Sequence, residues 1–392
     1  MPLCLSGKVK NCFLCVSFLI MQRKLTLLLA FPLTLCLFTQ SSNPPILQSS
    51  NPSILQSSNP SIFQSKKDTV TVIGVGDIMM GSNYPDDSGL PGDEGQFLFH
   101  YVAGVLKDAD VTMGNLEGVL LDQGGTAKTC RNPKVCYVFR SPVRYVHNLV
   151  NAGFDVLSLA NNHAGDFGPM GSRSTIETLE SSGLYHAGQV AKPYTTFEKD
   201  GIKYGFIAFA PNGGCVNIND LDAARKVVQH LDSVSDVVIV SFHGGAEGPA
   251  YQHVPRINEL FYGENRGNVY QFAHSVIDAG ADIVFGHGPH VVRGVEVYKD
   301  RFIAYSLGNF STYGGINVSG INGFAPIIKV FTTNEGRFLT AQITSCIQHS
   351  LSPVAIDSEK QVNKKIQELT KQDFPEANVV IDDEGWIKKS TN

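Results

Sequence analysis

Short apolar runs alternate with longer amphipathic stretches from Thr69 onward, and this alternation restricts the fold more than any other feature of the chain. The apolar runs read as strands at 69–75, 111–113, 155–160, 194–198, 201–209, 236–241, 282–285, 295–298 and 302–306. The amphipathic stretches read as helices at 96–107, 142–152, 171–182, 221–231 and 269–279. Strands that alternate with helices predict an α/β fold with a partly parallel sheet. The later hairpins predict mixed strand directions and two sheet layers flanked by helices.

The size of the chain allows a large core, and its charge argues against a polyanion-binding surface of the nucleic-acid type. It has 392 residues, of which 43% are hydrophobic and 17% charged, which suits one large or two modest domains. The formal net charge is -5, and the sequence has no Lys/Arg run with interleaved aromatic residues. Nucleic acid is therefore disfavoured as a partner.

Residues 1–40 have the composition of a signal or anchor segment. A basic start at Met21–Lys24 precedes an apolar run that ends at Phe38, and this run is too short to span a bilayer comfortably. Cys36 suggests lipid modification, but Leu35 stands where such a site needs a small residue. We expect an exported protein, either periplasmic or membrane-anchored at the cell envelope, and leave open whether the leader is cleaved.

Residues 41–68 repeat an eight-residue phrase rich in Ser, Asn, Pro and Gln, beginning at Ile46. Its composition is too polar to bury a face and too rich in proline for a helix, which predicts a disordered linker. The expected organisation then continues with one domain at 69–340 and a C-terminal extension at 341–392. Within the extension, residues 359–371 read as an exposed amphipathic helix.

The cysteines outside the leader fit an oxidising compartment. Cys130 and Cys136 bracket a loop short enough to close, so a disulfide between them is plausible. A zinc knuckle would need a second closely spaced pair of ligands, which the sequence lacks. Cys215 and Cys346 are left as either a second disulfide or free thiols.

Side chains that can bind a metal follow five of the expected strands. They are Asp77, Asn115, Glu117, Asn162, His163, Asp166, His243, Glu247, His287 and His290. Because ligand sites of α/β folds gather at the carboxyl ends of strands, these side chains are expected to converge. Carboxylates, imidazoles and amides that converge suit a divalent metal with an open position for water. Taken singly, Asp77 can be a turn former, and His243 can be a core histidine.

The order and wording of six motifs resemble the CapA family of poly-γ-glutamate capsule proteins, which belongs to the calcineurin-like metallophosphoesterase superfamily. The resemblance runs from about Thr69 to about Ile328. The motifs are Gly76-Asp77-Ile78-Met79-Met80-Gly81, Gly114-Asn115-Leu116-Glu117, Leu159-Ala160-Asn161-Asn162-His163, His243-Gly244-Gly245 with Glu247, Gly286-His287-Gly288-Pro289-His290 and Tyr305-Ser306-Leu307-Gly308-Asn309-Phe310.

The resemblance implies a four-layer α/β/β/α metallophosphoesterase-like sandwich with mixed sheets and a metal site at one edge. Asp77 matches the aspartate of the first strand that binds metal in this superfamily. Asn162 matches a further metal ligand, and His163 matches a histidine that stabilises the transition state.

Later motifs supply the remaining metal ligands that the resemblance implies. His243, together with His287 or His290, is similar to the later histidine ligands. Asn115 and Glu117 stand where the bridging aspartate motif falls. The metal would be Mn, Zn or Mg.

Two positions depart from the family pattern. Met79 replaces the histidine that pairs with the first-strand aspartate in active phosphoesterases, and Gly288 stands where the capsule family often has another histidine. Each change removes an imidazole, so a two-metal centre and a one-metal or weakened site both stay open.

The function implied is that of a CapA-like envelope protein in the synthesis, export or trimming of an anionic polymer such as poly-γ-glutamate. The site would be of the metal-dependent hydrolase type, with His163, Glu247 and Asn309 as its catalytic candidates. Arg293 is a candidate contact for an anionic substrate. Membrane-bound capsule synthesis subunits are candidate partners. The alternatives are a non-catalytic, polymer-binding accessory subunit and a secreted phosphoesterase or nucleotidase-like enzyme.

Overall fold

The computed structural model describes residues 67–130, 136–377 and 379–390. The leader expected at 1–40 and nearly all of the linker expected at 41–68 lie outside these residues. In the part of the chain that is described, no helix has the length and apolar character needed to cross a membrane.

A nine-stranded mixed sheet is built around the first strand, β1 (Thr69–Met79). Its order is β20-β21-β17-β16-β1-β2-β5-β6, and β15 pairs with the end of β1. The other strands of this sheet are β2 (Val111–Leu116), β5 (Val156–Ser158), β6 (Tyr185–Ala187), β15 (Asn309–Thr312), β16 (Ile327–Thr333), β17 (Phe338–Thr344), β20 (Val379–Ile381) and β21 (Trp386–Lys389). The strands β1, β2, β5, β6 and β15 are parallel, whereas β16 runs antiparallel to β1. β1 reads as a nearly continuous apolar run because both of its faces are covered.

A second sheet has six strands in the order β13-β14-β12-β9-β8-β7. They are β7 (Tyr194–Lys199), β8 (Ile202–Phe209), β9 (Val237–His243), β12 (Ile283–His287), β13 (Val295–Tyr298) and β14 (Arg301–Ala304). The four central strands are parallel, and the two edge strands are antiparallel hairpin partners. The remaining strands form two-stranded ladders: β3 (Val119–Leu120) with β4 (Arg140–Ser141), β10 (Leu260–Phe261) with β11 (Glu264–Asn265), and β18 (Cys346–Ile347) with β19 (Ala355–Ile356).

The two large sheets pack face to face around a shared apolar core. Val72 and Met113 of the first sheet belong to the same buried cluster as Phe206 and Phe285 of the second. Gly74 has no side chain where the Phe285 ring lies, and a Cβ there would come within 2.5 Å of that ring. The close approach of the sheets therefore depends on a glycine at this position.

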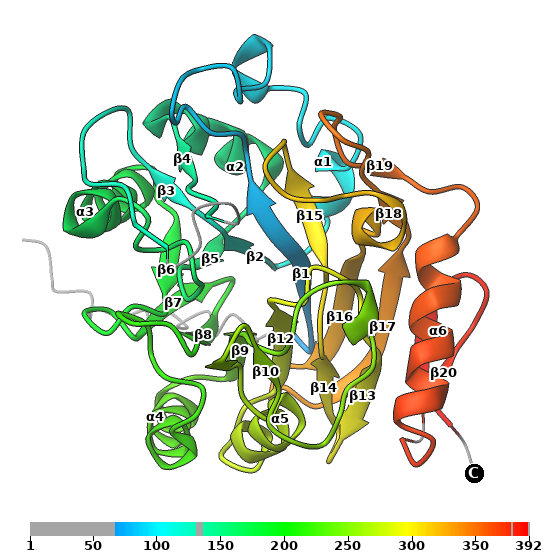
Figure 1. Ribbon diagram of the computed structural model, residues 1–392. Helices are drawn as coiled ribbons and strands as arrows, with labels where there is room; N and C mark the ends of the chain where they lie inside the picture. Colours follow the sequence, from blue (N-terminus) through cyan, green and yellow to red (C-terminus); the bar gives the residue numbers. More distant parts are fainter. Residues whose placement is uncertain (1–66, 131–135, 378, 391–392) are drawn as a thin grey trace, which may run out of the picture. The chain divides into compact units, whose positions relative to one another are not determined.

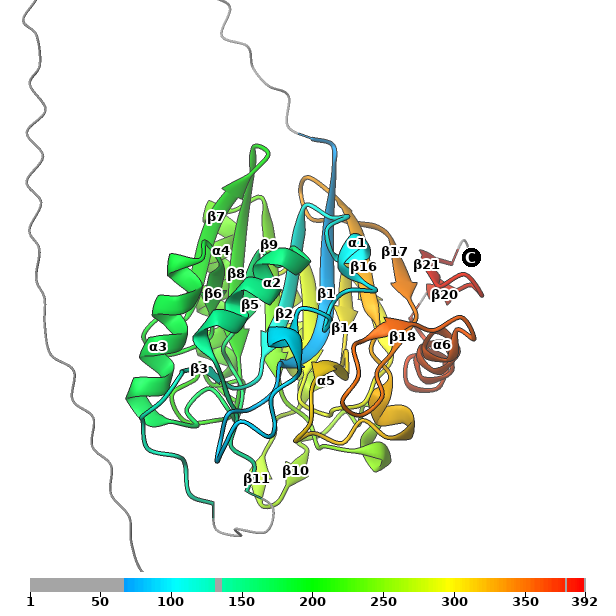
Figure 2. The ribbon, with the colours of Figure 1, turned by 90° about the horizontal axis from the view of Figure 1, so that it is seen from above.

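Helices cover the outer face of each sheet, which gives four layers (Figures 1 and 2). The helices α1 (Ala103–Leu106), α2 (Val146–Ala152) and α3 (Gly168–Ser181) pack Leu106, Leu149 and Leu179 on the first sheet. The helices α4 (Leu221–Val234) and α5 (Val269–Ile277) pack Val228 and Phe272 on the second. Short 3-10 helices are η1 (Asp93–Gly95), η3 (Val143–Tyr145), η4 (Pro249–Tyr251) and η5 (Gly320–Gly323). The predicted α/β/β/α sandwich with mixed sheets is confirmed.

The helix expected at 96–107 is reduced to α1, which covers only Ala103–Leu106. The residues before it form successive three-residue turns, such as Leu98 N–H to Gly95 O and Val102 N–H to Phe99 O. Phe99 and Val102 are buried. Aromatic and β-branched residues are weak helix formers, so their burial is compatible with a tighter, irregular turn.

The C-terminal residues pack onto the same body. Helix α6 (Gln361–Asp373) buries Val362, Ile366 and Leu369, so the expectation of an exposed helix is corrected. Strand β17 runs through residue 340, and β21 pairs with it, so residues on both sides of the expected boundary share one sheet. An amphipathic pattern shows that one face is apolar but not what covers it.

Candidate metal centre

The strand register brings polar side chains from the first sheet together. In the pairing of β1 with β2, Asp77 lies opposite Asn115, and in the pairing of β1 with β15 it lies opposite Asn309. In the second sheet, His243 of β9 lies opposite His287 of β12. Parallel strands end at the same edge, which is why residues far apart in sequence meet here.

Three side chains form the centre of the site: Asp77, Glu117 and His290. Each offers one ligand atom, and these atoms all lie within 4.8 Å of one another. Nδ1 of His290 lies 3.0 Å from Oδ2 of Asp77, and its Nε2 lies 3.7 Å from Oε1 of Glu117. Both carboxylates are fully buried, whereas the His290 side chain is 14% exposed. The site is therefore open to solvent on the side of His290.

Hydrogen bonds fix the orientation of Asp77. Its Oδ1 accepts from the side-chain amide of Asn115 at 2.8 Å. Oδ1 of Asn115 in turn accepts from the amide of Asn161 at 3.0 Å, and Asn161 also donates to Leu116 O at 2.9 Å. Asn115 thus lies beside the cluster, where its amide orients the first carboxylate, and its role as a metal ligand stays a prediction.

Asn309 holds His290 in an unusual backbone conformation. The φ of His290 is 55°, a left-handed value that is uncommon for residues other than glycine. Oδ1 of Asn309 lies 3.0 Å from Nδ1 of His290, and its amide donates to the carbonyl oxygens of His290, Asn317 and Asn322. Asn309 is therefore brought into the site, where it contacts His290.

Several buried polar atoms of the site have no hydrogen-bond partner among the described residues. They are both carboxylate oxygens of Glu117, both ring nitrogens of His243, and Oδ1 of Asn162. Buried polar atoms normally have a hydrogen-bond partner. A group of buried oxygen and nitrogen atoms without one therefore indicates a place where a cation can bind. The chemistry of these donors, a carboxylate, an imidazole and an amide oxygen, fits a divalent cation.

His287 is placed differently from the other predicted ligands. Its Nε2 lies 3.0 Å from Val75 O and its Nδ1 lies 3.3 Å from the hydroxyl of Ser241. A carbonyl oxygen can only accept, so Nε2 carries a proton and donates across to β1. His287 links the two sheets beneath the site, and it does not belong to the three-residue cluster of Asp77, Glu117 and His290.

The charges of the cluster shift each other's proton affinity. Burial disfavours ionisation of Asp77, but the hydrogen bond and charge of His290 outweigh it and lower the pKa to about 2. Burial, together with the charge of Asp77, raises the pKa of Glu117 to about 8. For His290, burial is overcome by the charge of Glu117 and by the bond to Asp77, and its pKa is raised to about 10. At neutral pH Asp77 is ionised, Glu117 is neutral and His290 is a cation.

His243 is suited to bind a cation through a neutral ring. It is fully buried, and its ring centroid lies 6.5 Å from that of His290. Burial, followed by the charge of Arg266, holds its pKa well below the usual value. A neutral imidazole is the form that ligates metals.

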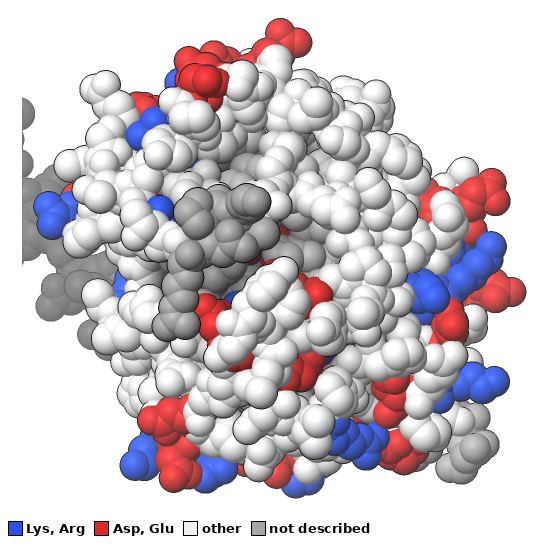
Figure 3. Space-filling model, in the orientation of Figure 1, with Lys and Arg blue, Asp and Glu red and all other residues white. Residues whose placement is uncertain are grey.

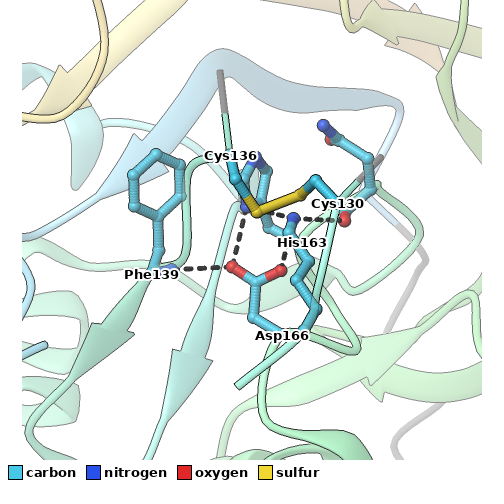
Figure 4. The surroundings of a disulfide bond; sticks show 7 residues. Cys130, Cys136, Phe139, His163 and Asp166 are labelled. Atoms are coloured by element: carbon cyan, nitrogen blue, oxygen red, sulfur yellow. Dashed lines mark hydrogen bonds and ion pairs between the residues drawn. A yellow bond between two sulfur atoms is a disulfide. The ribbon is translucent and has the colours of Figure 1, made fainter. Parts of the chain in front are cut away.

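His163 belongs to a second polar group at the same edge (Figure 4). Its Nδ1 lies 2.8 Å from Oδ2 of Asp166, while Oδ1 of Asp166 pairs with the Lys128 ammonium at 2.6 Å. The Phe139 ring stacks on the imidazole with a centroid distance of 4.2 Å. Burial lowers the pKa of His163, against the opposing effect of the bond to Asp166. The i,i+3 spacing of His163 and Asp166 was a signal for this pair, but Lys128 lies outside every motif.

Glu247 lies close to the cluster and is held by an arginine that the motifs do not reveal. Its carboxylate forms an ion pair with Arg266, whose side chain is only 2% exposed. The charge of Glu247 contributes to the raised pKa of both Glu117 and His290. The catalytic role predicted for Glu247 stays a prediction.

Arg293 does not face a substrate. Its side chain is fully buried and pairs with Glu259 through two bonds of 2.8 and 2.7 Å. Its Nε also donates to Tyr251 O at 2.9 Å. Because a buried guanidinium needs a matching carboxylate, Arg293 stabilises the loop after β9, and the expected contact with an anionic substrate is corrected.

Met79 and Gly288, the two residues that depart from the family pattern, both lie against nearby backbone. Met79 is buried, and its sulfur accepts from Gly81 N–H at 3.3 Å. Gly288 has a φ of 113°, and a Cβ there would lie 2.9 Å from backbone atoms of Gly244. A histidine at position 288 would therefore need a different path of this loop.

The disulfide predicted between Cys130 and Cys136 is present (Figure 4). Cys215 and Cys346 are free and buried, which decides between the two alternatives left open for them. Burial raises the pKa of the Cys215 thiol to about 11, and that of Cys346 to about 12. Neither thiol is therefore a ready nucleophile.

The sequence is similar to those of bacterial capsule proteins. It is 27% identical over 327 residues to the capsule biosynthesis protein CapA of Bacillus anthracis, covering 78% of this chain and 74% of that protein. It is 27% identical over 321 residues to the PGA biosynthesis protein CapA of Bacillus subtilis (strain 168), covering 78% of each. A probable polyglutamine synthesis accessory protein of Mycobacterium tuberculosis is 30% identical over 235 residues, covering 53% of this chain and 57% of that protein.

Solved structures show weaker similarity. A putative 5'-nucleotidase from Staphylococcus aureus aligns with a TM-score of 0.40 and 14% identity, over 78% of this chain and 58% of that one. The family model described as bacterial capsule synthesis protein PGA_cap matches residues 71–313, which include Asp77, Glu117, His163, His290 and Asn309. The chain belongs to this PGA_cap family.

Proposed function

We propose that this protein acts at the cell envelope in the synthesis, export or trimming of an anionic capsule polymer of the poly-γ-glutamate type. Two relatives that align with most of the chain are named for capsule or PGA biosynthesis. The observation that carries a metal-dependent hydrolase-type site is the cluster of Asp77, Glu117 and His290 beside the unpaired nitrogens of His243.

The divalent ion would be held by this cluster, with His243 and Asn162 as further donors. Manganese, zinc or magnesium each accept carboxylate oxygen, and the imidazoles favour the first two. The ion would polarise an amide or phosphoryl oxygen of the substrate and lower the pKa of water. Asn115 and Asn309 form hydrogen bonds that orient Asp77 and His290. Residues that hydrogen-bond to metal ligands commonly have this role.

His163 would transfer a proton or stabilise negative charge at the reacting group. Nδ1 donates to Asp166, which leaves Nε2 as the ring atom available to substrate. In this arrangement Asp166 fixes the tautomer and Phe139 fixes the plane of the ring. A histidine held in this way is suited to act on a leaving group.

The surroundings make a bound cation important for an anionic substrate. On the face seen in Figure 3, blue Lys and Arg side chains are mostly peripheral, whereas red Asp and Glu side chains surround the position of β10 near the middle. A divalent ion bound at Asp77, Glu117 and His290 would add positive charge for an anionic substrate to contact. Metal binding and polymer binding are therefore coupled in this proposal.

The disulfide between Cys130 and Cys136 supports export, because such bonds persist in oxidising compartments. An N-terminal leader would deliver the chain to that compartment. Detection of the chain in an envelope fraction, with this disulfide intact, tests the proposed location.

The alternative is an accessory subunit that binds polymer without cleaving it. Met79 favours this alternative, because a thioether is a poor ligand for hard divalent ions. The accessory role named for the Mycobacterium tuberculosis relative agrees with it. A secreted phosphoesterase is the third candidate and enters the test as a substrate class.

The test combines metal titration with a substrate screen. Calorimetry with Mn²⁺, Zn²⁺ and Mg²⁺ is expected to show binding that Glu117→Gln and His290→Gln weaken, while the exposed His147→Gln serves as the control. γ-Glutamyl peptides and phosphoesters are then offered to the loaded protein. Hydrolysis that His163→Ala abolishes supports the enzyme, and metal binding without hydrolysis supports the accessory subunit. Absence of metal binding would overturn the proposed site.

A further inference from the structure

The disulfide joins two chain segments that both lie next to His163 (Figure 4). Lys128 lies two residues before Cys130, and Phe139 lies three residues after Cys136. None of the motifs of the family resemblance contains these four residues. The contacts of Lys128 and Phe139 with the candidate catalytic histidine are therefore seen only in the structure.

The segment before the disulfide contacts Asp166 through two polar groups of Lys128. The backbone N–H of Lys128 donates to Asp166 O at 2.7 Å, and its ammonium lies 2.6 Å from Oδ1. The same ammonium donates to Asn162 O at 3.2 Å. Lys128 is thus tied to both ends of the turn that carries His163.

The segment after the disulfide holds the other oxygen of Asp166 and the ring itself. The backbone N–H of Phe139 donates to Oδ2 of Asp166 at 2.6 Å, and the Phe139 ring stacks on His163 at an interplanar angle of 28°. Oδ2 is also the oxygen nearest Nδ1 of His163. Each carboxylate oxygen of Asp166 is therefore engaged by one of the two segments.

Lys128 acts on the histidine through Asp166. Its ammonium lies 3.1 Å from Nδ1 of His163, but an ammonium can only donate. Nδ1 cannot donate to Asp166 and accept from Lys128 at once, and the shorter contact, to a carboxylate, is the stronger. Asp166 is fully buried, so without the Lys128 cation its negative charge would lack compensation.

The disulfide joins the two segments at one end, and the β3–β4 ladder joins them at the other. At the other end, β3 pairs with β4, which fixes Val119 beside Arg140. The Cα atoms of Cys130 and Cys136 are 5.5 Å apart. The segment that carries Lys128 and the segment that carries Phe139 are therefore fixed at both ends, with Asp166 and His163 between them.

We propose that Lys128 is a positioning residue for His163, and that the Cys130–Cys136 disulfide holds Lys128 and Phe139 in the places from which they fix its tautomer and ring plane. The inference deepens the proposed function, because His163 is the proposed proton-transfer group. It assigns a role in the site to a lysine and a disulfide that no motif contains.

The test reads His163 directly by NMR of ¹⁵N-histidine-labelled protein, which reports which ring nitrogen carries the proton. The variants are Lys128→Met, Lys128→Arg and Cys130→Ser/Cys136→Ser, with the exposed Lys226→Met as the control. Lys128→Met and the double serine variant are expected to change the ring ¹⁵N signals of His163. Lys128→Arg, which keeps the cation, is expected to restore them, and Lys226→Met leaves them unchanged.

Metal titration separates this inference from the proposed function. Among the described contacts Lys128 touches none of Asp77, Glu117 and His290, so the Lys128 variants are expected to keep metal binding, with any change limited to the contribution of Asn162, whose backbone oxygen accepts from Lys128. If a hydrolysed substrate is found, Lys128→Met is expected to lower kcat about tenfold to a hundredfold with little change in KM. Unchanged His163 signals in folded Lys128→Met protein would overturn the inference even if metal binds. If the double serine variant does not fold, Lys128→Met and Lys128→Arg still decide the role of the lysine. If the parent protein itself binds no metal, that result would count against the proposed function alone.

Discussion

Nδ1 of His290 lies 3.0 Å from Oδ2 of Asp77, so the two side chains form an ion pair at the centre of the site. The pair arises because β1 and the loop after β12 end at the same edge of the two sheets. A cation that binds here must compete with the proton that His290 carries.

Metal binding is therefore expected to release protons and to strengthen as the pH rises. At pH 7 Glu117, whose pKa is about 8, and His290, whose pKa is about 10, both hold protons that a metal must displace. Calorimetry in buffers of different ionisation enthalpy is expected to show release of about two protons per ion at pH 7. The affinity is expected to rise through pH 8 and to continue rising toward pH 10. An affinity independent of pH between 6 and 9 would contradict the assignment of these two ligands.

Without metal, stability is expected to fall as the pH rises. The pKa of Glu117 is about 8 in the folded protein against an ordinary value of 4.5. Between pH 4.5 and pH 8 the folded state therefore binds more protons than the unfolded state. The stabilising effect is complete below about pH 4.5 and is lost as the pH rises through 8, at up to about 1.4 kcal/mol per pH unit. Glu117→Gln is expected to flatten this part of the profile, measured by Tm in the presence of a chelator. A profile that keeps its slope in the variant would assign the effect elsewhere.

Loss of the Asn115 amide is expected to weaken metal binding without unfolding the protein. Asn115→Leu leaves Oδ1 of Asp77 without its donor, and outer partners of this kind are worth about tenfold to a hundredfold in metal affinity. The exposed Asn151→Leu is the matched control. Calorimetry measures the affinity, and circular dichroism checks the fold. Equal affinity in Asn115→Leu and the parent would show that Asp77 needs no orienting amide.

Gly74 is expected to tolerate no side chain between the sheets. In Gly74→Ala the new methyl group would meet the Phe285 ring at 2.5 Å, and overpacking of this kind costs about 1–3 kcal/mol. Gly104→Ala is the control, because nothing lies within 4 Å of its Cβ position in α1. Denaturant unfolding measures the difference in free energy. Phe285→Leu combined with Gly74→Ala is expected to recover part of the loss, and no recovery would mean that the clash lies elsewhere.

Arg293 and Glu259 are expected to be coupled. Removing one partner of a buried ion pair leaves an uncompensated charge, so Arg293→Met is expected to cost about 3–5 kcal/mol of the free energy of unfolding. The double variant Arg293→Met/Glu259→Leu is expected to be more stable than the single one. A double-mutant cycle measures the coupling, and additive losses would contradict it.

Much of the architecture was predictable because strands and helices leave periodic patterns in sequence. The buried runs that became β1, β8 and β9 predicted parallel strands, and the apolar faces of α4 and α5 predicted helices that cover a sheet. The turn at 96–102 and the burial of α6 were not predictable, because both depend on what packs against the segment. The same limit applies to single residues of the site.

The sequence by itself determined the α/β alternation, the family, and which strand ends carry oxygen and nitrogen donors, since motifs and periodicity are local properties of the chain. Only the tertiary structure decided that His290 joins Asp77 and Glu117, whereas His287 is engaged by Val75 and Ser241. It also decided that Lys128 pairs with Asp166 and that Arg293 is buried against Glu259. These outcomes depend on the direction of side chains after the two sheets have packed, and that direction is set by contacts between segments more than thirty residues apart.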